Sequence, residues 1–318
     1  QEPATARLAS LPAAEKPARQ ERGDRILLHA RPTAPLEAGT LAALEALPGV
    51  RAVWAAPAIF FPQTGAPLFT GAAGMLAYAE GGACPGDRCQ GGCSLGEAAL
   101  AYEAALLGLS PDEVLAEALR RFEVMRAAVH RGLSSDLPPM QLLQPTARGI
   151  FQAEKDGRLP TGGLHTRAAA RAMAVMHVNG GMGVVCAAPT AGSAGTLPGV
   201  LVTLAEEPVL AAGDQQAPGA GLHQRDLALA LLAASAVGLV VAERATFAAE
   251  VAGCQVEIGA AGAMAAAAVV EAAGGSARQA LDAAAVAFQN TMGLVCDMVQ
   301  GIVEIPCHTR NAAAAANA

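Results

Sequence analysis

Aromatic and charged residues are both scarce in this sequence. Phe, Trp and Tyr make up 3% of the 318 residues, and Asp, Glu, Lys and Arg together make up 15%. Hydrophobic residues account for 53%, which is enough to form a large buried core. Because aromatic residues are so few, that core must be built from Ala, Leu and Val. Because Ala is the best helix former, the composition favours closely packed helices.

Basic residues are also few, and lysine is almost absent. Lys16 lies in a polar stretch and Lys155 in a segment expected to be a loop, and the sequence has no other lysine. An enzyme that uses pyridoxal phosphate needs a lysine for its Schiff base, so this class is disfavoured. The formal net charge is -7, which gives no basic surface for nucleic acid or an anionic membrane. A small-molecule partner is favoured instead.

Signals for export and membrane insertion are missing as well. Residues 1–23 are polar, lack the apolar run of a secretory signal, and predict a disordered tail. The apolar run at 227–242 is shorter than the roughly 20 residues that span a bilayer, so we expect a central core helix and no membrane association. Seven cysteines, an odd number, favour a reducing compartment over a disulfide framework, which predicts a cytoplasmic location.

Helical patterns dominate from about residue 94 to the end, and they predict a mainly α, all-helical domain over residues 94–318. Ser110 followed by Pro111 is typical of a helix start. Helices are expected at residues 94–132, 165–177, 264–273 and 280–295, with a loop-rich segment at 134–163. Upstream, residues 24–80 have β-prone runs at 25–29 and 50–61 around a helical stretch at 36–47. This pattern predicts a small βαβ-like module.

Three cysteines near the C-terminus stand in three different local sequences. Cys254 lies in Gly-Cys-Gln-Val-Glu-Ile-Gly, Cys296 in Leu-Val-Cys-Asp, and Cys307 in Pro-Cys-His-Thr-Arg-Asn. Forty-one residues separate the first pair and ten the second, which excludes a zinc knuckle formed by one turn. Such spacing suits a site to which distant segments each bring one thiolate. A four-iron cluster held by three cysteines would leave one iron open as a Lewis acid.

A run of small residues upstream is a second candidate site. Residues 189–195 read Pro-Thr-Ala-Gly-Ser-Ala-Gly and precede an apolar segment at 197–204. Amides in such a turn can bind a carboxylate or a phosphate, whereas the alternative is a tight turn between packed helices. Cys186, within an apolar run, is expected to be a small core residue.

Together these motifs resemble the α-chain, or α-domain, of the iron-sulfur L-serine dehydratases. The resemblance covers residues 94–318 and implies a 4Fe-4S cluster bound by Cys254, Cys296 and Cys307. It implies the conversion of L-serine to pyruvate and ammonia, in amino-acid degradation and gluconeogenesis. It also implies that the loop binds the substrate carboxylate; the candidate residues are Asn179, Thr190, Gly192, Ser193 and Gly195.

The resemblance does not identify a catalytic base in this sequence. In the family a histidine of a Ser-Ser-His-Thr-type motif on the β-domain or β-chain removes the proton, and this sequence has no such motif. His308, beside Cys307, is a candidate by position, as are His165 and His177. We therefore expect a separate β-chain to supply the base, and we also expect homo-oligomerisation.

Two further questions stay open at this level. Cys84, Cys89 and Cys93 have a C-x4-C-x3-C spacing that matches neither common zinc pairs nor ferredoxin runs, so incidental thiols in a surface loop are expected. The alternatives to serine dehydration are an L-cysteine desulfidase-like lyase on the same scaffold and a cluster-free, non-catalytic subunit.

Overall fold

The computed structural model describes most of the chain. It describes residues 2–11, 17–22, 25–30, 32, 36–37, 39–53, 63–81, 92–207 and 222–318. The chain divides into two compact units, residues 1–62 and residues 63–318, which are considered separately. The second unit contains all of the predicted site residues.

The first unit contains a two-stranded antiparallel sheet. Strand β1 (Ala18–Arg22) pairs with β2 (Arg25–His29), with Arg22 opposite Arg25. Helices α1 (Glu2–Ala9) and α2 (Thr40–Glu45) are the helical elements described in this unit. The strand at 25–29 was predicted, but its partner was not.

The structure therefore differs from two predictions for the N-terminal region. Residues 1–23 were expected to be a disordered tail, yet α1 and β1 lie within them. The βαβ-like module was expected to end near residue 80, whereas the unit ends at residue 62 and its strands are antiparallel. Antiparallel strands can be joined by two residues, so a polar segment beside β2 can pair where a crossover could not. Residues 50–53 are not a strand, and residues 54–61 lie outside the described residues.

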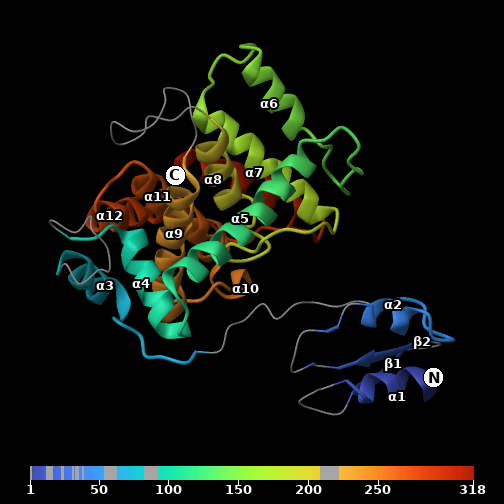
Figure 1. The fold of residues 1–318 in the computed structure, drawn as a ribbon. Coiled ribbons are helices and arrows are strands. Elements are labelled where there is room, and N and C mark those ends of the chain that lie inside the picture. The colour runs from blue at the N-terminus through green and yellow to red at the C-terminus, as the bar shows by residue number, and fades with distance from the viewer. Residues whose placement is uncertain are drawn as a thin grey trace. The chain divides into compact units, whose positions relative to one another are not determined.

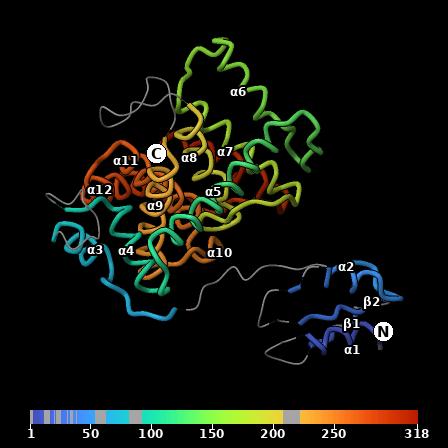
Figure 2. The backbone as a smooth tube through the Cα atoms, viewed as in Figure 1, coloured from blue at the N-terminus to red at the C-terminus, as the bar shows by residue number. Residues whose placement is uncertain are grey.

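Apart from an isolated β-bridge between Val299 and Ile302, the regular secondary structure described in the second unit is helical, which confirms the mainly α prediction (Figures 1 and 2). Its helices are α3 (Gly71–Glu80), α4 (Leu95–Leu107), α5 (Pro111–Gly132), α6 (Ala147–Lys155), α7 (Leu164–Gly180), α8 (Thr196–Glu206), α9 (Gln224–Arg244), α10 (Ala249–Ala252), the short 3-10 helix η1 (Cys254–Val256), α11 (Ile258–Ala272), α12 (Ala277–Gln289) and α13 (Glu304–Asn317).

Helices α9 and α11 form the centre of this unit. α11 packs against α8, α9, α12 and α13, while α9 also contacts α4 and α5 (Figure 1). By length and composition alone, Gln224–Arg244 and Cys254–Ala272 could each cross a membrane, but 61% and 72% of their most apolar windows are buried inside the protein. α9 is therefore packed as a core helix, as the sequence predicted.

Small residues allow neighbouring helices to approach closely. A Cβ added to Gly132 of α5 would lie 2.0 Å from the carbonyl oxygen of Ala174 in α7. A Cβ added to Gly199 of α8 would lie 2.6 Å from the carbonyl oxygen of Ala168, also in α7. Backbone contacts of this kind bring the helices of a core with few aromatic residues close together.

Helix starts follow the signals in the sequence, whereas some ends do not. Ser94, Ser110 and Ser276 each form a capping box with the residue three positions later. α7 ends in the Asn-Gly-Gly turn, as predicted. The segment 134–163, expected to be loop-rich, also contains α6, and α12 ends at Gln289, six residues before the predicted end at 295.

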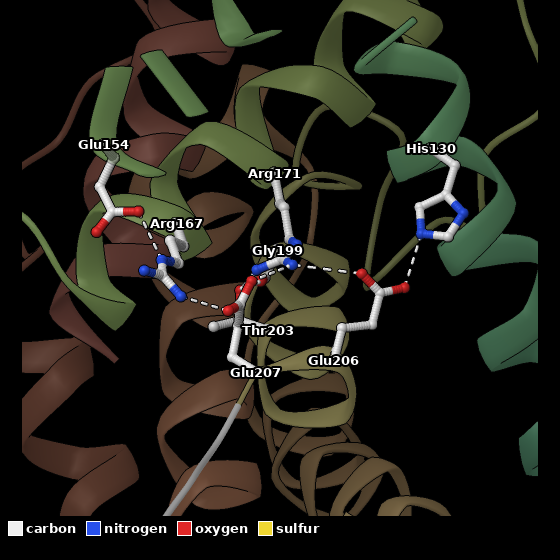
Figure 3. A network of polar contacts seen from close by, with 8 residues as sticks. All are labelled: His130, Glu154, Arg167, Arg171, Gly199, Thr203, Glu206 and Glu207. Atoms are coloured by element: carbon white, nitrogen blue, oxygen red, sulfur yellow. Dashed lines mark hydrogen bonds and ion pairs between the residues drawn. The ribbon is translucent and has the colours of Figure 1, made fainter. Parts of the chain in front are cut away.

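A network of charged side chains fixes the C-terminal end of α8. It contains His130 of α5, Glu154 of α6, Arg167 and Arg171 of α7, and Thr203, Glu206 and Glu207 at the end of α8 (Figure 3). Arg171 is 2% exposed and donates to Thr203 Oγ1 at 2.9 Å and to Glu207 Oε1 at 2.7 Å. Arg167 bonds Glu154 and Glu207, and His130 bonds Glu206, so α5, α6, α7 and α8 are joined at this point.

Candidate functional site

Cys254 lies in a tight turn that packs on the segment carrying Cys296. Gly253 has a φ of 76°, and a Cβ there would lie 2.5 Å from the carbonyl oxygen of Leu294, so glycine is required at this position. The amide of Gln255 donates to the same carbonyl oxygen at 3.1 Å. These contacts bring Cys254 beside Cys296 although forty-one residues separate them.

Cys307 comes from a third element, the first turn of α13. Cys254 and Cys307 are buried and Cys296 is half-buried, and all three are free thiols. Burial raises the pKa of the Cys254 thiol. Burial, with Cys254, Glu257 and Cys296 nearby, raises the pKa of Cys307 to about 12. The three cysteines are thus electrostatic neighbours, and a cation among them would be needed to hold them as thiolates.

Arg310, one turn after Cys307, is the cation already present at this site. Its Nη1 donates to Cys254 Sγ at 3.3 Å and to the carbonyl oxygen of Val295 at 2.7 Å. The same nitrogen lies 2.6 Å from Asp297 Oδ1. Arg310 therefore connects all three cysteine-bearing elements: it stands on α13, bonds Cys254, and binds the residues on either side of Cys296.

The loop at 190–195 is held in shape by its own hydroxyl groups. Thr190 Oγ1 and Ser193 Oγ lie 3.0 Å apart, and the amide of Thr190 donates to Ser193 Oγ at 3.2 Å. Ser193 is fully buried, so its hydroxyl group faces the loop interior. Asn179 donates through Nδ2 to the carbonyl oxygen of Ala191 at 2.7 Å. Ser193 and Asn179 thus bond to the loop itself.

Two side chains connect this loop to the cysteine-bearing elements. Thr190 Oγ1 donates to Oε1 of Glu257 at 2.6 Å, and Glu257 lies three residues after Cys254. Asn311 of α13 donates to the carbonyl oxygen of Gly192 at 2.8 Å and accepts from the amide of Gly195 at 3.1 Å. The loop and the cysteine-bearing elements therefore lie together and form one site.

The arrangement of the cysteines differs from a single-ion site. Among the described residues, no three His, Cys, Asp or Glu side chains are grouped so as to hold one metal ion. Cysteine ligands of one zinc ion each lie about 2.3 Å from it, so their sulfur atoms are close together. Cysteines of an iron-sulfur cluster bind different irons, which spaces the sulfur atoms more widely. Cys254, Cys296 and Cys307 are neighbours but do not form such a single-ion group.

Comparison with known proteins identifies the family. A family model described as the serine dehydratase alpha chain matches residues 90–318. The chain belongs to this family.

Several curated serine dehydratase chains are similar to this one. The "Probable L-serine dehydratase, alpha chain" of Bacillus subtilis is 36% identical over 219 residues, which is 69% of each chain. The protein of the same name from Latilactobacillus sakei is 47% identical over 148 residues, 46% of this chain and 65% of that one. The "L-serine dehydratase, alpha chain" of Peptoniphilus asaccharolyticus is 36% identical over 197 residues, 62% of this chain and 63% of that one. The matches thus span about two thirds of the length of each relative.

The three histidines suggested by the sequence have neighbours outside the 190–195 loop. His308 is 3% exposed and faces α7, where His177 lies close to it. Burial, with His177 as a second cause, lowers the pKa of His308 to about 4, and neither of its ring nitrogens has a well-aligned hydrogen bond. His177 is itself buried, with Nε2 2.8 Å from the carbonyl oxygen of Pro138. His165 Nδ1 lies 3.0 Å from the carbonyl oxygen of Ala316.

Three site residues were not singled out from the sequence. Glu257, Arg310 and Asn311 make the contacts that join the loop to the cysteines. All three lie inside the motifs around Cys254 and Cys307. Their polar side chains within those motifs were the available signal.

Cys93 and Cys186 are the other cysteines among the described residues, and both pack with the main core. Cys186 was expected to be a buried core residue, but it is half-buried and packs on the edge of the main core. Cys93 is disulfide-bonded. Cys84 and Cys89 lie outside the described residues.

Proposed function

We propose that this chain is the cluster-binding subunit of a lyase that converts L-serine to pyruvate and ammonia. The observation that carries the proposal is the connection of the 190–195 loop to the cysteine-bearing elements through Glu257 and Asn311. The names of the similar chains support L-serine as the substrate. A site of this kind places a substrate-binding loop directly beside a group of thiols.

The donor set suits a 4Fe-4S cluster. Cys254, Cys296 and Cys307 would hold it, because each is a free thiol on a different element and iron-sulfur clusters are bound by thiolates. Arg310 would contribute a positive charge and a hydrogen bond to Cys254. When bound, the cluster would supply a Lewis acid for the departure of the serine hydroxyl group.

The loop offers hydrogen-bond donors for the substrate carboxylate. Among the amides of residues 190–196, those of Ala191 and Gly192 have no acceptor within the described part of the chain. Two free amides at one turn bind a carboxylate well. They fit this role better than the hydroxyl group of Ser193, which is fully buried inside the loop.

The base that removes the α-proton is proposed to come from a β-chain. Of the histidines suggested by the sequence, His308 and His177 are buried against each other and His165 bonds the backbone near the C-terminus. No hydrogen bond between any of these three histidines and the 190–195 loop is found among the described residues. The designation "alpha chain" in similar proteins also supports a second chain.

Iron content tests the cluster assignment. The chain purified without oxygen should be brown and hold about four irons. Cys254→Ala, Cys296→Ala and Cys307→Ala should each lose most of the iron, whereas Cys186→Ala, a free cysteine outside the site, should retain it. Iron lost equally from all four variants, or from none, would exclude these three cysteines as the ligands.

Turnover of L-serine tests the activity and the partner together. The loaded chain alone should release little pyruvate, and adding a β-chain with the Ser-Ser-His-Thr-type motif should raise the rate at least tenfold. Full activity in the single chain would show that the base is local, and His308→Ala would then abolish it. No pyruvate from the reconstituted pair would refute the proposed reaction.

A further inference from the structure

Glu257 lies between the loop and the cysteines, and its carboxylate has no cationic partner among the described residues. It follows η1 directly and is half-buried. Thr190 donates to its Oε1 at 2.6 Å, and no Lys, Arg or His among the described residues forms an ion pair with it. Cys254 and Cys307 both lie within its electrostatic reach. A negative charge in this position repels thiolates, so thiolate binding alone does not account for it.

The carboxylate also lies against the part of the loop that has free amides. A Cβ added to Gly192 would stand 3.1 Å from Glu257 Oε2 and 3.2 Å from Oε1. Glu257 is therefore in contact distance of Gly192, whose amide, like that of Ala191, has no acceptor within the described residues. Donors for an anion and an acceptor for a cation are thus side by side.

We propose that Glu257 binds the α-ammonium group of an amino-acid substrate whose carboxylate is held by the amides of Ala191 and Gly192. This inference rests on the proposed function, because it takes the 190–195 loop as the carboxylate site. The two charged groups of an α-amino acid are attached to the same carbon, and the two complementary groups of the protein are neighbours. The ammonium charge also offsets the repulsion between Glu257 and the substrate carboxylate.

Glu257 would then select the class of substrate. A 2-hydroxy acid has the same carboxylate and nearly the same shape as an amino acid, but its α-substituent is uncharged. Charge-assisted hydrogen bonds are roughly twice as strong as neutral ones, so Glu257 should favour the amino acid. Thr190 acts as a positioning residue, because its hydroxyl group fixes one carboxylate oxygen and leaves the other free for the substrate.

The experiment compares Glu257→Gln with wild type in the cluster-loaded chain reconstituted with its β-chain. Removing one charge-assisted bond should raise KM for L-serine about ten- to a hundredfold, while kcat changes much less. Glu250→Gln changes an exposed carboxylate of α10 and should leave both constants unchanged.

Two unreactive inhibitors give the sharper readout. L-Alanine and L-lactate differ only in the ammonium or hydroxyl group on the α-carbon. Wild type should bind L-alanine at least tenfold more tightly than L-lactate, and Glu257→Gln should bring the two inhibition constants close together. Thr190→Val should also reduce the preference for L-alanine over L-lactate, but by less than Glu257→Gln does.

The outcomes distinguish this inference from the proposed function. A wild-type pair that forms no pyruvate refutes the function itself. If wild type is active and Glu257→Gln keeps its KM and its preference for L-alanine, the inference is wrong. If Glu257→Gln instead loses its iron, the residue supports the metal site, and the ammonium assignment is again overturned. If that variant fails to fold, an unchanged preference for L-alanine in Thr190→Val would contradict the inference.

Discussion

The side-chain oxygen of Asn311 accepts hydrogen bonds from both the amide and the hydroxyl group of Thr196, each at 2.9 Å. Thr196 is the first residue of α8, whose own N-cap residue, Gly195, has no side chain to provide a cap. A residue of α13 therefore caps α8 from outside the helix. Because the charged network around Arg171 fixes the other end of α8, the helix that follows the substrate loop is fixed at both ends (Figure 3).

Replacing Asn311 should destabilise the fold strongly. Asn311 is fully buried, and Asn311→Ala would leave the amide of Gly195 without an acceptor and the amide of Thr196 with only the carbonyl oxygen of Ser193, at 3.3 Å. Buried donors without a partner cost about 1–3 kcal/mol each, so we expect a loss of about 3 kcal/mol in the free energy of unfolding. Chemical denaturation of the metal-free chain measures it. Asn317→Ala, an exposed asparagine of the same helix that bonds Asn290, should change stability by less than about 0.5 kcal/mol.

Arg310 should organise the cysteines before any metal binds. Arg310→Gln removes the charge that bonds Cys254, Val295 and Asp297. Hydrogen exchange in the metal-free variant should become faster at residues 293–297, because the backbone there loses its anchor to α13. Arg310→Lys should restore part of the protection. Arg278→Gln, at an exposed pair with Glu80, serves as the control. Unchanged exchange at 293–297 would show that the segment is held without Arg310.

The sequence predicted the helices better than it predicted the site. Ser94 and Ser110 mark helix starts because the capping interaction is local, and both helices begin where expected. The contact between Thr190 and Glu257 joins residues 67 positions apart, and no periodicity in the chain encodes it. The cysteine motifs indicated which segments matter. Their arrangement depends on how α8, α11 and α13 pack, which local patterns do not specify.

The N-terminal unit also contains an element, β1, that its local sequence does not predict. β1 has the sequence Ala-Arg-Gln-Glu-Arg, which is too polar to read as a strand. It becomes one by pairing with β2, whose apolar residues were recognised. A strand that depends on its partner cannot be predicted from its own residues.

Glu271 should make stability depend on pH near neutrality. Its carboxylate accepts from Ser94 Oγ at 2.5 Å and from the amide of Gly96 at 2.9 Å, and burial raises its pKa to about 7. For a carboxyl group with a raised folded pKa, the stabilising contribution is complete below the unfolded value of 4.5 and is lost as pH rises through the folded value. The free energy of unfolding should therefore fall by about 2 kcal/mol between pH 5 and pH 8 from this group alone.

Glu271→Gln tests that dependence. Glutamine can accept from the Gly96 amide and donate to the Ser94 hydroxyl group, so both contacts are kept without a titrating group. The variant should match wild type at pH 5 and exceed it by about 2 kcal/mol at pH 8. Glu80→Gln, at an exposed ion pair, should leave the shape of the pH curve unchanged. A wild-type curve as flat as that of Glu271→Gln would contradict the assignment.

Among the residues of the charged network, Arg171 should contribute most to the stability of α8. It is 2% exposed, lies 4.8 Å from the centre of the Phe151 ring, and bonds Glu207, which is 5% exposed. Desolvation opposes the charge on Glu207, but the hydrogen bonds and charges of Arg171 and Arg167 outweigh it and hold the pKa of this carboxyl group below its usual value. Arg171→Met keeps much of the side-chain volume and leaves Glu207 with one cation.

Removing one partner of a buried ion pair costs about 3–5 kcal/mol, because the other charge stays buried. Arg171→Met should therefore lower the free energy of unfolding by about 3–5 kcal/mol at pH 7. The loss should be smaller at pH 5, since Glu207 can then take up a proton more easily in the folded variant than in wild type. Arg126→Met removes an exposed pair with Glu123 and should cost less than about 1 kcal/mol. Denaturation of the three proteins at both pH values measures these differences. Equal losses in Arg171→Met and Arg126→Met would show that the network does not clamp α8.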